Sequence, residues 1–291
     1  MRKSDKIESA GFANPIATRY LTDMKIATWN INSVRLRIAQ VTQFLKDEAP
    51  DVLCLQETKC NDDQFPRKAF EQAGYGHLAI SGQPAYHGVA IAARVPLKKI
   101  SVKHFCGKDD CRHVQATLPG GIELHNFYVP AGGDEPDRKA NEKFDHKLNF
   151  MTEMSDWFSA MEGPRKKRVL VGDLNVAPHE HDVWSHKQLL KVVSHTPIEV
   201  EHLETVMRAS NWIDVARALH DDDEKLYSWW SYRAKDWRAS NRGRRLDHIW
   251  VTPALKKAAL AKGREGFQIH DYARSWEKPS DHAPVTLELS I

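Results

Sequence analysis

The sequence predicts an α/β protein in which packed β-sheets are covered by helices on their outer sides. Short apolar segments that end in polar residues recur in both halves of the 291-residue chain, as buried strands do. Fewer amphipathic helices lie between these segments, and no Gly/Ser-rich linker or internal repeat divides the chain. Strands interleaved with helices along the whole chain favour layered sheets with helices outside.

Most of the expected strands share one pattern, an apolar run whose carboxyl-terminal end carries polar or acidic residues. The first of them reads KIATWNI, and a later one reads RVLVGDLN. They cover residues 25–31, 51–58, 86–94, 121–130, 168–175, 246–255 and 282–291.

Three segments between these strands show the periodicity of amphipathic helices. The first covers residues 37–50 and ends at Pro50, because the residue before a proline disfavours helical geometry. The second runs from about residue 140 to 162, and the third covers residues 199–219. Their apolar faces are expected to pack on the outer sides of the sheets.

Charge and hydropathy limit the possible partners. Lys plus Arg is 42 and Asp plus Glu is 39, a net charge of +3, which permits an anionic partner without requiring one. No stretch approaches the about 20 consecutive apolar residues that a membrane-spanning helix needs. Residues 1–23 lack the apolar core of a secretory signal, and their mixed composition predicts a poorly ordered tail ahead of a catalytic domain at 24–291.

The cysteines indicate a reducing compartment. They are Cys54, Cys60, Cys106 and Cys111, and they form no disulfide-rich framework, so the cytoplasm is the expected location. Cys106 and Cys111 have the spacing of half a zinc site, but no second Cys or His pair completes a set of four ligands. Free thiols are therefore expected.

Acidic and amide side chains recur where the expected strands end. They are Asn30, Glu57, Asp173 with Asn175, Asp247, and Asp281 with His282. A single carboxylate in such a place is usually a turn or helix-capping residue. Recurrence at several strand ends instead predicts that these side chains converge at one edge of the sheets, because a carboxylate there costs desolvation unless it is paired or binds metal.

The donor types favour Mg²⁺ or Mn²⁺ as the metal. Hard carboxylate and amide oxygens are available, and no His/Cys cluster has zinc-like spacing. Such an ion polarises a phosphoryl oxygen and stabilises a leaving alkoxide. Hydrolysis of a phosphodiester also needs a base for the attacking water and donors for the charge on the phosphate. Asp, His and Asn side chains at these positions could supply both.

Six short motifs carry a resemblance to a known family. They read TWNIN, LQETK, NFYVPAGG, VGDLNVAP, NRGRRLDH and KPSDHAPV, in this order between about Met24 and Ile291. GDLN together with SDH is similar to the endonuclease/exonuclease/phosphatase superfamily. The remaining motifs narrow the resemblance to the exonuclease III family of apurinic/apyrimidinic (AP) endonucleases. The fold that it implies is a four-layered α/β sandwich, in which two mixed β-sheets pack face to face with helices outside.

The resemblance implies a metal site. Glu57 would bind the catalytic metal with help from Asn30, and Asp281 would orient the site or touch a second ion. The expected metal-binding set is Asn30, Glu57, Asp173, Asn175, Asp281 and His282.

The resemblance also implies the residues that act on the phosphate. Asp173 would activate the attacking water or aid the leaving group, and Asn175 would orient it. His282, paired with Asp247, would hold the phosphate and stabilise the transition state. Tyr128 would lie beside the scissile phosphate. A His–Asp pair suits this role, since it fixes the ring tautomer and favours the imidazolium cation.

Basic residues interleaved with tryptophans at 221–245 predict contact with DNA, because cations meet phosphates while aromatic rings stack or wedge. By resemblance, this loop enters the minor groove and lines the pocket for an extrahelical abasic sugar. The expected DNA-binding residues are Arg35, Arg112, Trp229, Trp230, Arg242, Arg244 and Arg245. Arg244 stands where relatives often carry an apolar residue that lines this pocket, which bears on the preference for abasic sites. The His-rich loop at 179–195 is expected to be solvated.

The expected function is that of a monomeric DNA-repair nuclease that uses Mg²⁺ or Mn²⁺. By resemblance, it would cut double-stranded DNA 5′ to abasic sites. It would also act at 3′ ends as an exonuclease and as a phosphodiesterase or phosphatase. One alternative is a superfamily phosphatase or phosphodiesterase for a non-DNA phosphoester, against which the loop at 229–245 argues. Another is a catalytically dead DNA-binding module, against which the intact acidic set argues.

Overall fold

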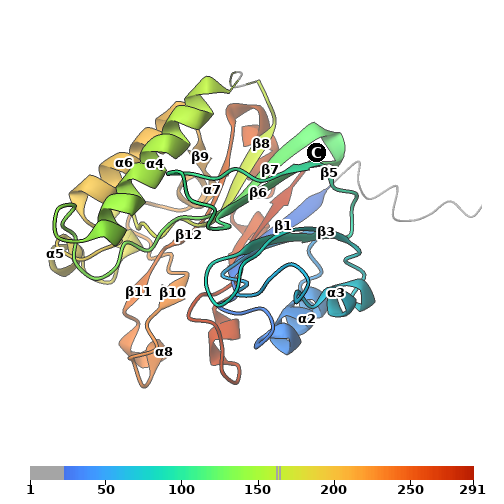
Figure 1. The fold of residues 1–291 in the computed structure, drawn as a ribbon, viewed down its shortest axis with the longest axis horizontal. Coiled ribbons are helices and arrows are strands. Elements are labelled where there is room, and N and C mark those ends of the chain that lie inside the picture. Colours follow the sequence, from blue (N-terminus) through green and yellow to red (C-terminus); the bar gives the residue numbers. More distant parts are fainter. Residues whose placement is uncertain (1–22, 162, 164) are drawn as a thin grey trace, which may run out of the picture.

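The computed structural model describes residues 23–161, 163 and 165–291. Two six-stranded mixed sheets pack face to face, and helices cover both outer faces (Figure 1). The predicted four-layered α/β sandwich is therefore confirmed. The predicted tail at 1–23 lies, apart from Asp23, outside the described residues. No helix among the described residues is long and apolar enough to cross a membrane.

The first sheet has the strand order β13-β14-β1-β2-β4-β3. The β1–β2 pair is parallel and the other neighbours are antiparallel. Helices α2 (Ile38–Asp47) and α3 (Arg67–Gln72) cover its outer face. The strands are β13 (Phe267–Ile269), β14 (Val285–Leu289), β1 (Met24–Asn30), β2 (Val52–Gln56), β4 (Val89–Ala93) and β3 (His77–Ser81).

The second sheet has the order β5-β6-β7-β8-β12-β9. Its β7–β8 pair is parallel and the other neighbours are antiparallel. Helices α4 (Glu142–Ala160) and α6 (Pro197–Ala209) cover its outer face. The strands are β5 (Lys98–Ser101), β6 (His113–Leu118), β7 (Ile122–Tyr128), β8 (Arg168–Asp173), β12 (Asp247–Val251) and β9 (Ile213–Asp214).

The two sheets are built alike, and this determines where the polar strand ends lie. Each sheet has five pairs of neighbouring strands. When the first sheet is read from β13 and the second from β9, the third pair is parallel in both and the other pairs are antiparallel. In each sheet a central parallel pair is flanked by an antiparallel strand from later in the chain. The carboxyl ends of β1, β2, β7 and β8 therefore share their sheet edges with the amino ends of β14 and β12.

Alternate residues of the central strands belong to different core layers. In β8, Val169 and Val171 face the other sheet, while Leu170 packs under α4 and α6. In β1, Ile26 joins the core between the sheets and Trp29 packs under α2. Strands that are buried on both faces read as nearly continuous apolar runs, which is the pattern that the sequence shows.

Short elements complete the fold. Helices α7 (Val215–Leu219) and α9 (Lys256–Leu260) contribute to the core between the sheets. Strands β10 (Trp229–Trp230) and β11 (Gly243–Arg244) form a hairpin with α8 (Trp237–Ser240) near its tip, and this hairpin projects beyond the sheets (Figure 1). Helix α5 (His186–Leu189) lies in the loop between β8 and α6.

The single helix predicted at 199–219 is wrong, because the structure divides it. α6 ends at Ala209, and Asn211 adopts a left-handed backbone with φ 52°. Asp214 then begins the separate helix α7 by accepting a hydrogen bond from the amide of Ala216. Strands β3, β5, β6 and β13 lie outside the predicted segments, and β9 lies inside the segment predicted as a helix. Strands β9 and β13 are short, and β5 is exposed along its length, so these three carry little apolar periodicity.

A buried histidine pair beneath α4 makes the fold sensitive to acid. His113 Nε2 and His125 Nδ1 share a hydrogen bond of 3.3 Å, and both residues are buried. Burial, assisted by the positive charge of Arg168, lowers the pKa of His125 to about 3. The His125 ring therefore stays neutral in the folded protein at pH values where an unfolded histidine is charged.

We expect the free energy of unfolding to fall as the pH drops below about 6.5, because only the unfolded chain then gains the proton. The loss due to His125 is roughly 2 kcal/mol at pH 5. Urea unfolding at pH 7 and pH 5 measures this loss. Between pH 7 and pH 5, the His125→Gln variant, which cannot titrate at this position, should lose about that much less free energy of unfolding than the wild type. An equal pH dependence in the variant would contradict the assignment.

Candidate active site

The polar strand ends of the two sheets meet at one place. Asn30 ends β1 in the first sheet, and Asp173 ends β8 in the second. The Asn30 Nδ2 donates to Asp173 Oδ2 and to Glu57 Oε1, each at 2.8 Å. One buried amide therefore bridges two carboxylates and joins the sheets.

Glu57 is held in a strained turn after β2. Glu57 and Lys59 have left-handed backbones, with φ 50° and 52°, at a cost of roughly 1–3 kcal/mol each. The turn packs tightly, since a Cβ on Gly88 would lie 2.2 Å from Thr58 Oγ1. Lys59 Nζ lies 2.7 Å from Glu57 Oε2. Burial acts to raise the pKa of Glu57, but Lys59 and the Asn30 bond outweigh it and keep that pKa below its ordinary value.

Asp173 is buried among hydrogen-bond donors. The Asn175 backbone amide donates to Oδ1 at 3.0 Å, and the Asn175 Nδ2 donates to Oδ2 at 3.1 Å. Burial, together with the negative charge of Asp247, raises the pKa of Asp173 to about 7 although His282 opposes the shift. The carboxyl group can therefore gain or lose a proton near neutral pH.

His282 lies between two carboxylates. Its Nδ1 is 2.8 Å from Asp247 Oδ2, and its Nε2 is 3.7 Å from Asp173 Oδ2. Ser228 Oγ donates to the same Asp247 oxygen at 2.7 Å and holds it in place. Burial acts to lower the pKa of His282, but the charges of Asp247 and Asp173 outweigh it and raise the pKa to about 10. The histidine is therefore a cation at neutral pH.

Tyr128 ends β7 and hydrogen-bonds Glu57. Burial and the charges of Glu57 and Asp173 raise the pKa of Tyr128 well above its ordinary value, so the phenol is neutral. The Arg112 guanidinium lies 4.9 Å from the Tyr128 ring centre and pairs with Asp110. Arg112 is buried and supports Tyr128, and its DNA contact stays a prediction.

Asp281 connects the site to the hairpin. It accepts hydrogen bonds from Trp229 Nε1 at 2.9 Å and from Asn32 Nδ2 at 3.1 Å. Neither Asn32 nor Ser228 has a predicted role. Asn32 lies within the TWNIN motif, so its position could have suggested one. Ser228 lies in a polar loop and carries no such signal.

The site opens into a cleft of about 860 Å³. Loops at 131–134, 184–194 and 229–246 form its walls, and Asn30 and Asp247 lie buried below it. The predicted residues that line the cleft directly are Glu57, Tyr128, Asp173, Asn175, Trp229, Trp230, Arg242, Arg244, Asp281 and His282.

The donors in this cleft fit a hard divalent cation. Asp173, Asp247 and His282 place one ligand atom each within 4.8 Å of one another, a group that could hold a metal ion. His282 Nδ1 and Asp247 Oδ2 are already bonded to each other, however. Glu57 suits such an ion better, because its carboxylate lines the cleft and its ion-pair partner among the described residues is Lys59, whose long side chain is flexible.

The remaining predicted DNA contacts differ in exposure. Arg35 and Arg242 are exposed, and the Arg242 guanidinium lies 4.7 Å from the Trp184 ring centre. Arg244 and Trp229 are half-buried and line the cleft. These side chains are accessible to a ligand, and their DNA contacts stay predictions.

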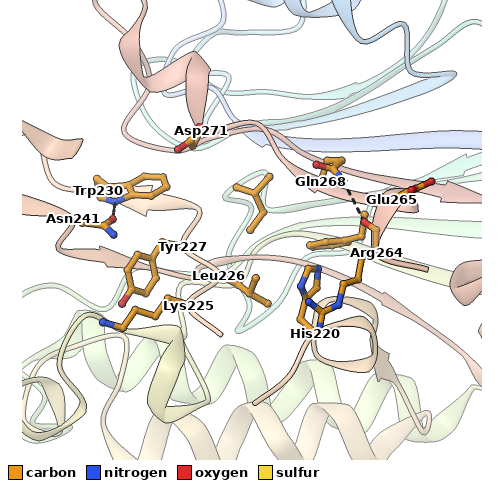
Figure 2. A pocket seen from close by; sticks show the side chains of 12 residues that line it. His220, Lys225, Leu226, Tyr227, Trp230, Asn241, Arg264, Glu265, Gln268 and Asp271 are labelled. Carbon is orange, nitrogen blue, oxygen red and sulfur yellow. Dashed lines mark hydrogen bonds between the residues drawn. The ribbon is translucent and has the colours of Figure 1, made fainter. Parts of the chain in front are cut away.

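Two predicted DNA contacts are buried instead. Arg245 is 1% exposed, and its guanidinium lies 2.7 Å from both Asp182 Oδ1 and Asp214 Oδ2. Trp230 is 5% exposed, and its Nε1 donates to Asn241 Oδ1 at 3.1 Å beside a second cavity (Figure 2). The predicted DNA contact is therefore corrected to a structural role for Arg245, and little of the Trp230 ring is available to stack on a base.

The fold and the acidic, histidine-containing cleft are those of the endonuclease/exonuclease/phosphatase family. The chain belongs to this family, since the family model matches residues 27–282. Exodeoxyribonuclease III of Haemophilus influenzae is 30% identical over 91% of this chain and 100% of that protein. The structure of an AP endonuclease from Archaeoglobus fulgidus is 31% identical, with a TM-score of 0.83 over 92% of this chain and 99% of that one.

A third relative is the 3′ phosphatase NExo from Neisseria, whose structure was determined bound to a product DNA hairpin. It is 31% identical to this chain, with a TM-score of 0.81 over 92% of this chain and 100% of that one. Together, these relatives confirm the predicted similarity to exonuclease III and the AP endonucleases.

We expect Arg245→Met to lower the free energy of unfolding by about 3–5 kcal/mol, because Asp182 and Asp214 would lose their shared buried partner. The matched control is Arg242→Met, which removes an exposed guanidinium nearby and should cost less than about 0.5 kcal/mol. Urea unfolding of both variants measures the difference. Equal stability of the two variants would contradict a buried ion network.

Proposed function

We propose that this protein is a divalent-metal-dependent DNA-repair nuclease, which cuts 5′ to abasic sites and also processes the 3′ ends of double-stranded DNA. The observation that carries the proposal is the meeting of Glu57, Asp173 and His282 in one cleft beneath a basic, aromatic hairpin. Relatives named exodeoxyribonuclease III, AP endonuclease and 3′ phosphatase support it.

In this proposal Asp173 is the general base. A carboxylate with a pKa of about 7 accepts a proton from the attacking water more readily than an ordinary aspartate does. Asn175 donates two hydrogen bonds to this carboxylate and so keeps it oriented toward the water. The proton of the attacking water goes to a lone pair of the Asp173 carboxylate that accepts no hydrogen bond.

His282 and Tyr128 stabilise the charge on the phosphate. The imidazolium donates its Nδ1 proton to Asp247 and presents its Nε2 proton to the cleft. Tyr128 remains protonated at neutral pH, and its hydroxyl, which bonds Glu57 in this structure, can donate to a phosphate oxygen when it turns away from that carboxylate. Donors that are already positioned before the reaction stabilise developing charge without reorganisation.

Glu57 and Asn30 would hold the divalent cation, Mg²⁺ or Mn²⁺. When bound, the ion polarises a phosphoryl oxygen and stabilises the leaving alkoxide. Of the other predicted ligands, Asp173 and Asn175 form the base, His282 contacts the phosphate, and Asp281 holds Trp229 and Asn32. Both His282 and Glu57 line the cleft, but His282 is a cation bonded to Asp247 whereas Glu57 is an anion, and this difference supports the division.

The substrate is held mainly through its phosphates. Arg35 and Arg242 are exposed cations, and contacts of this kind carry little sequence information. Binding should therefore weaken steeply with salt. An abasic residue is favoured because no base has to be unstacked when it leaves the helix. The protein acts as a monomer in the cytoplasm.

Glu57→Gln should lower the Mg²⁺-dependent cleavage rate of an abasic-site duplex by roughly a hundredfold or more, because it removes the charge that holds the ion. Its DNA affinity in EDTA should stay equal or rise, since a negative charge beside phosphates is lost. Glu71→Gln, which changes an exposed glutamate on α3, is the matched control. An unchanged cleavage rate in Glu57→Gln would contradict the proposed role of Glu57 as a metal ligand.

Two labelled duplexes separate the proposed activities. One carries a single abasic-site analogue, and the other is undamaged with a recessed 3′ end. We expect incision at the analogue with Mg²⁺ but not with EDTA, while shortening of the second duplex measures the 3′-end activity. Digestion of the 3′ end alone would exclude the abasic-site preference. Cleavage of neither duplex by folded protein would favour a non-DNA phosphoester as the substrate.

A further inference from the structure

Arg244 is a fixed cation inside the cleft. It pairs with Trp229 in the β10–β11 hairpin, and its guanidinium carbon lies 5.1 Å from the centre of that ring. Its Nη1 donates to the Val193 carbonyl at 2.9 Å and to Ser194 Oγ at 2.7 Å. Its Nε is buried and has no acceptor among the described residues. The side chain is therefore held in place with donor capacity unused.

Arg244 also lacks a neutralising carboxylate. No described Asp or Glu forms an ion pair with it, in contrast to its neighbour Arg245. The carboxylate of Glu199 interacts electrostatically with Arg244, but Glu199 is already paired with the buried ammonium of Lys147. A planar guanidinium with free donors and no carboxylate partner is suited to binding an anion such as phosphate.

This cation lies in the same cleft as the catalytic residues and is linked to them through Trp229. Trp229, against which Arg244 packs, donates its Nε1 to Asp281 Oδ2, and its backbone forms a bridge with His282. Arg244 and His282 line the same cleft, and Leu246 lies on its wall. A ligand with one phosphate at His282 therefore has a second cationic point within the same cavity.

We propose that Arg244 binds a second phosphate of the substrate, the one on the 3′ side of the sugar whose 5′ phosphodiester bond is cut. This inference rests on the proposed function, which sets the direction of cleavage. The scissile phosphate lies at His282, the sugar lies against Trp229 and Leu246, and the following phosphate meets Arg244. Substrates that carry this phosphate are preferred over those that end in a 3′-hydroxyl at the same sugar.

Titration with two small probes tests the assignment without turnover. The probes are 2-deoxyribose 5-phosphate and 2-deoxyribose 3,5-bisphosphate, measured by calorimetry in EDTA. The wild type should bind the bisphosphate at least about tenfold more tightly. Arg244→Gln should lose this advantage while its affinity for the monophosphate stays within about threefold of the wild type. Arg244→Lys, which keeps the charge, should retain part of it.

The matched control is Arg238→Gln, which removes an exposed guanidinium of the same hairpin that pairs with Asp271 outside the cleft. It should leave both affinities unchanged. A bisphosphate advantage that survives Arg244→Gln would overturn the proposal. An equal loss of affinity for both probes would also overturn it, because that result means that Arg244 only maintains the shape of the cleft.

Cleavage assays distinguish the possible sources of this phosphate. The substrates are an abasic analogue inside a strand, the same analogue at a 3′ end with a terminal phosphate, and the analogue at a 3′ end with a hydroxyl. Arg244→Gln should raise KM for the first two and leave the third unchanged. If the wild type cleaves none of them, the proposed function fails, whereas the titration with sugar phosphates still decides the role of Arg244.

Discussion

The site depends on one buried amide that joins two sheets. The Asn30 side chain donates to Glu57 and to Asp173, and these bonds hold the end of β1 against the end of β8. Such contact is possible because the two sheets share one strand order and pack through a common apolar core. A neutral donor between two carboxylates lowers their repulsion without neutralising either charge, so both remain available for chemistry.

The surroundings then give the two carboxylates different properties. Lys59 and the Asn30 amide hold the pKa of Glu57 below its ordinary value, against the effect of burial. Burial and the charge of Asp247 raise the pKa of Asp173 to about 7. One group is thus a permanent anion that suits a metal ion, and the other can exchange a proton near neutrality. Pairs of carboxylates whose environments separate their pKa values are typical of hydrolytic sites.

The sequence predicts strand ends well because they are local features. Asn30, Asp173 and Asp247 all follow or precede apolar runs, and each lies where the pattern indicates. Whether a charged residue is buried depends on contacts with residues that are distant in the sequence. Arg245 pairs with Asp182, 63 residues earlier in the chain, and nothing near Arg245 in the sequence indicates that pairing. The sequence predicts DNA contact for Arg242, Arg244 and Arg245 alike, but only the structure separates Arg244, which lines the cleft, from its buried neighbour Arg245.

The most direct test of the central claim is a crystal structure of the protein with bound Mn²⁺, in which anomalous scattering locates the ion. The account predicts an anomalous peak at the Glu57 carboxylate beside Asn30, with the His282–Asp247 hydrogen bond intact. A peak enclosed instead by Asp173, Asp247 and His282 would contradict it, as would the absence of any peak in this cleft at saturating Mn²⁺.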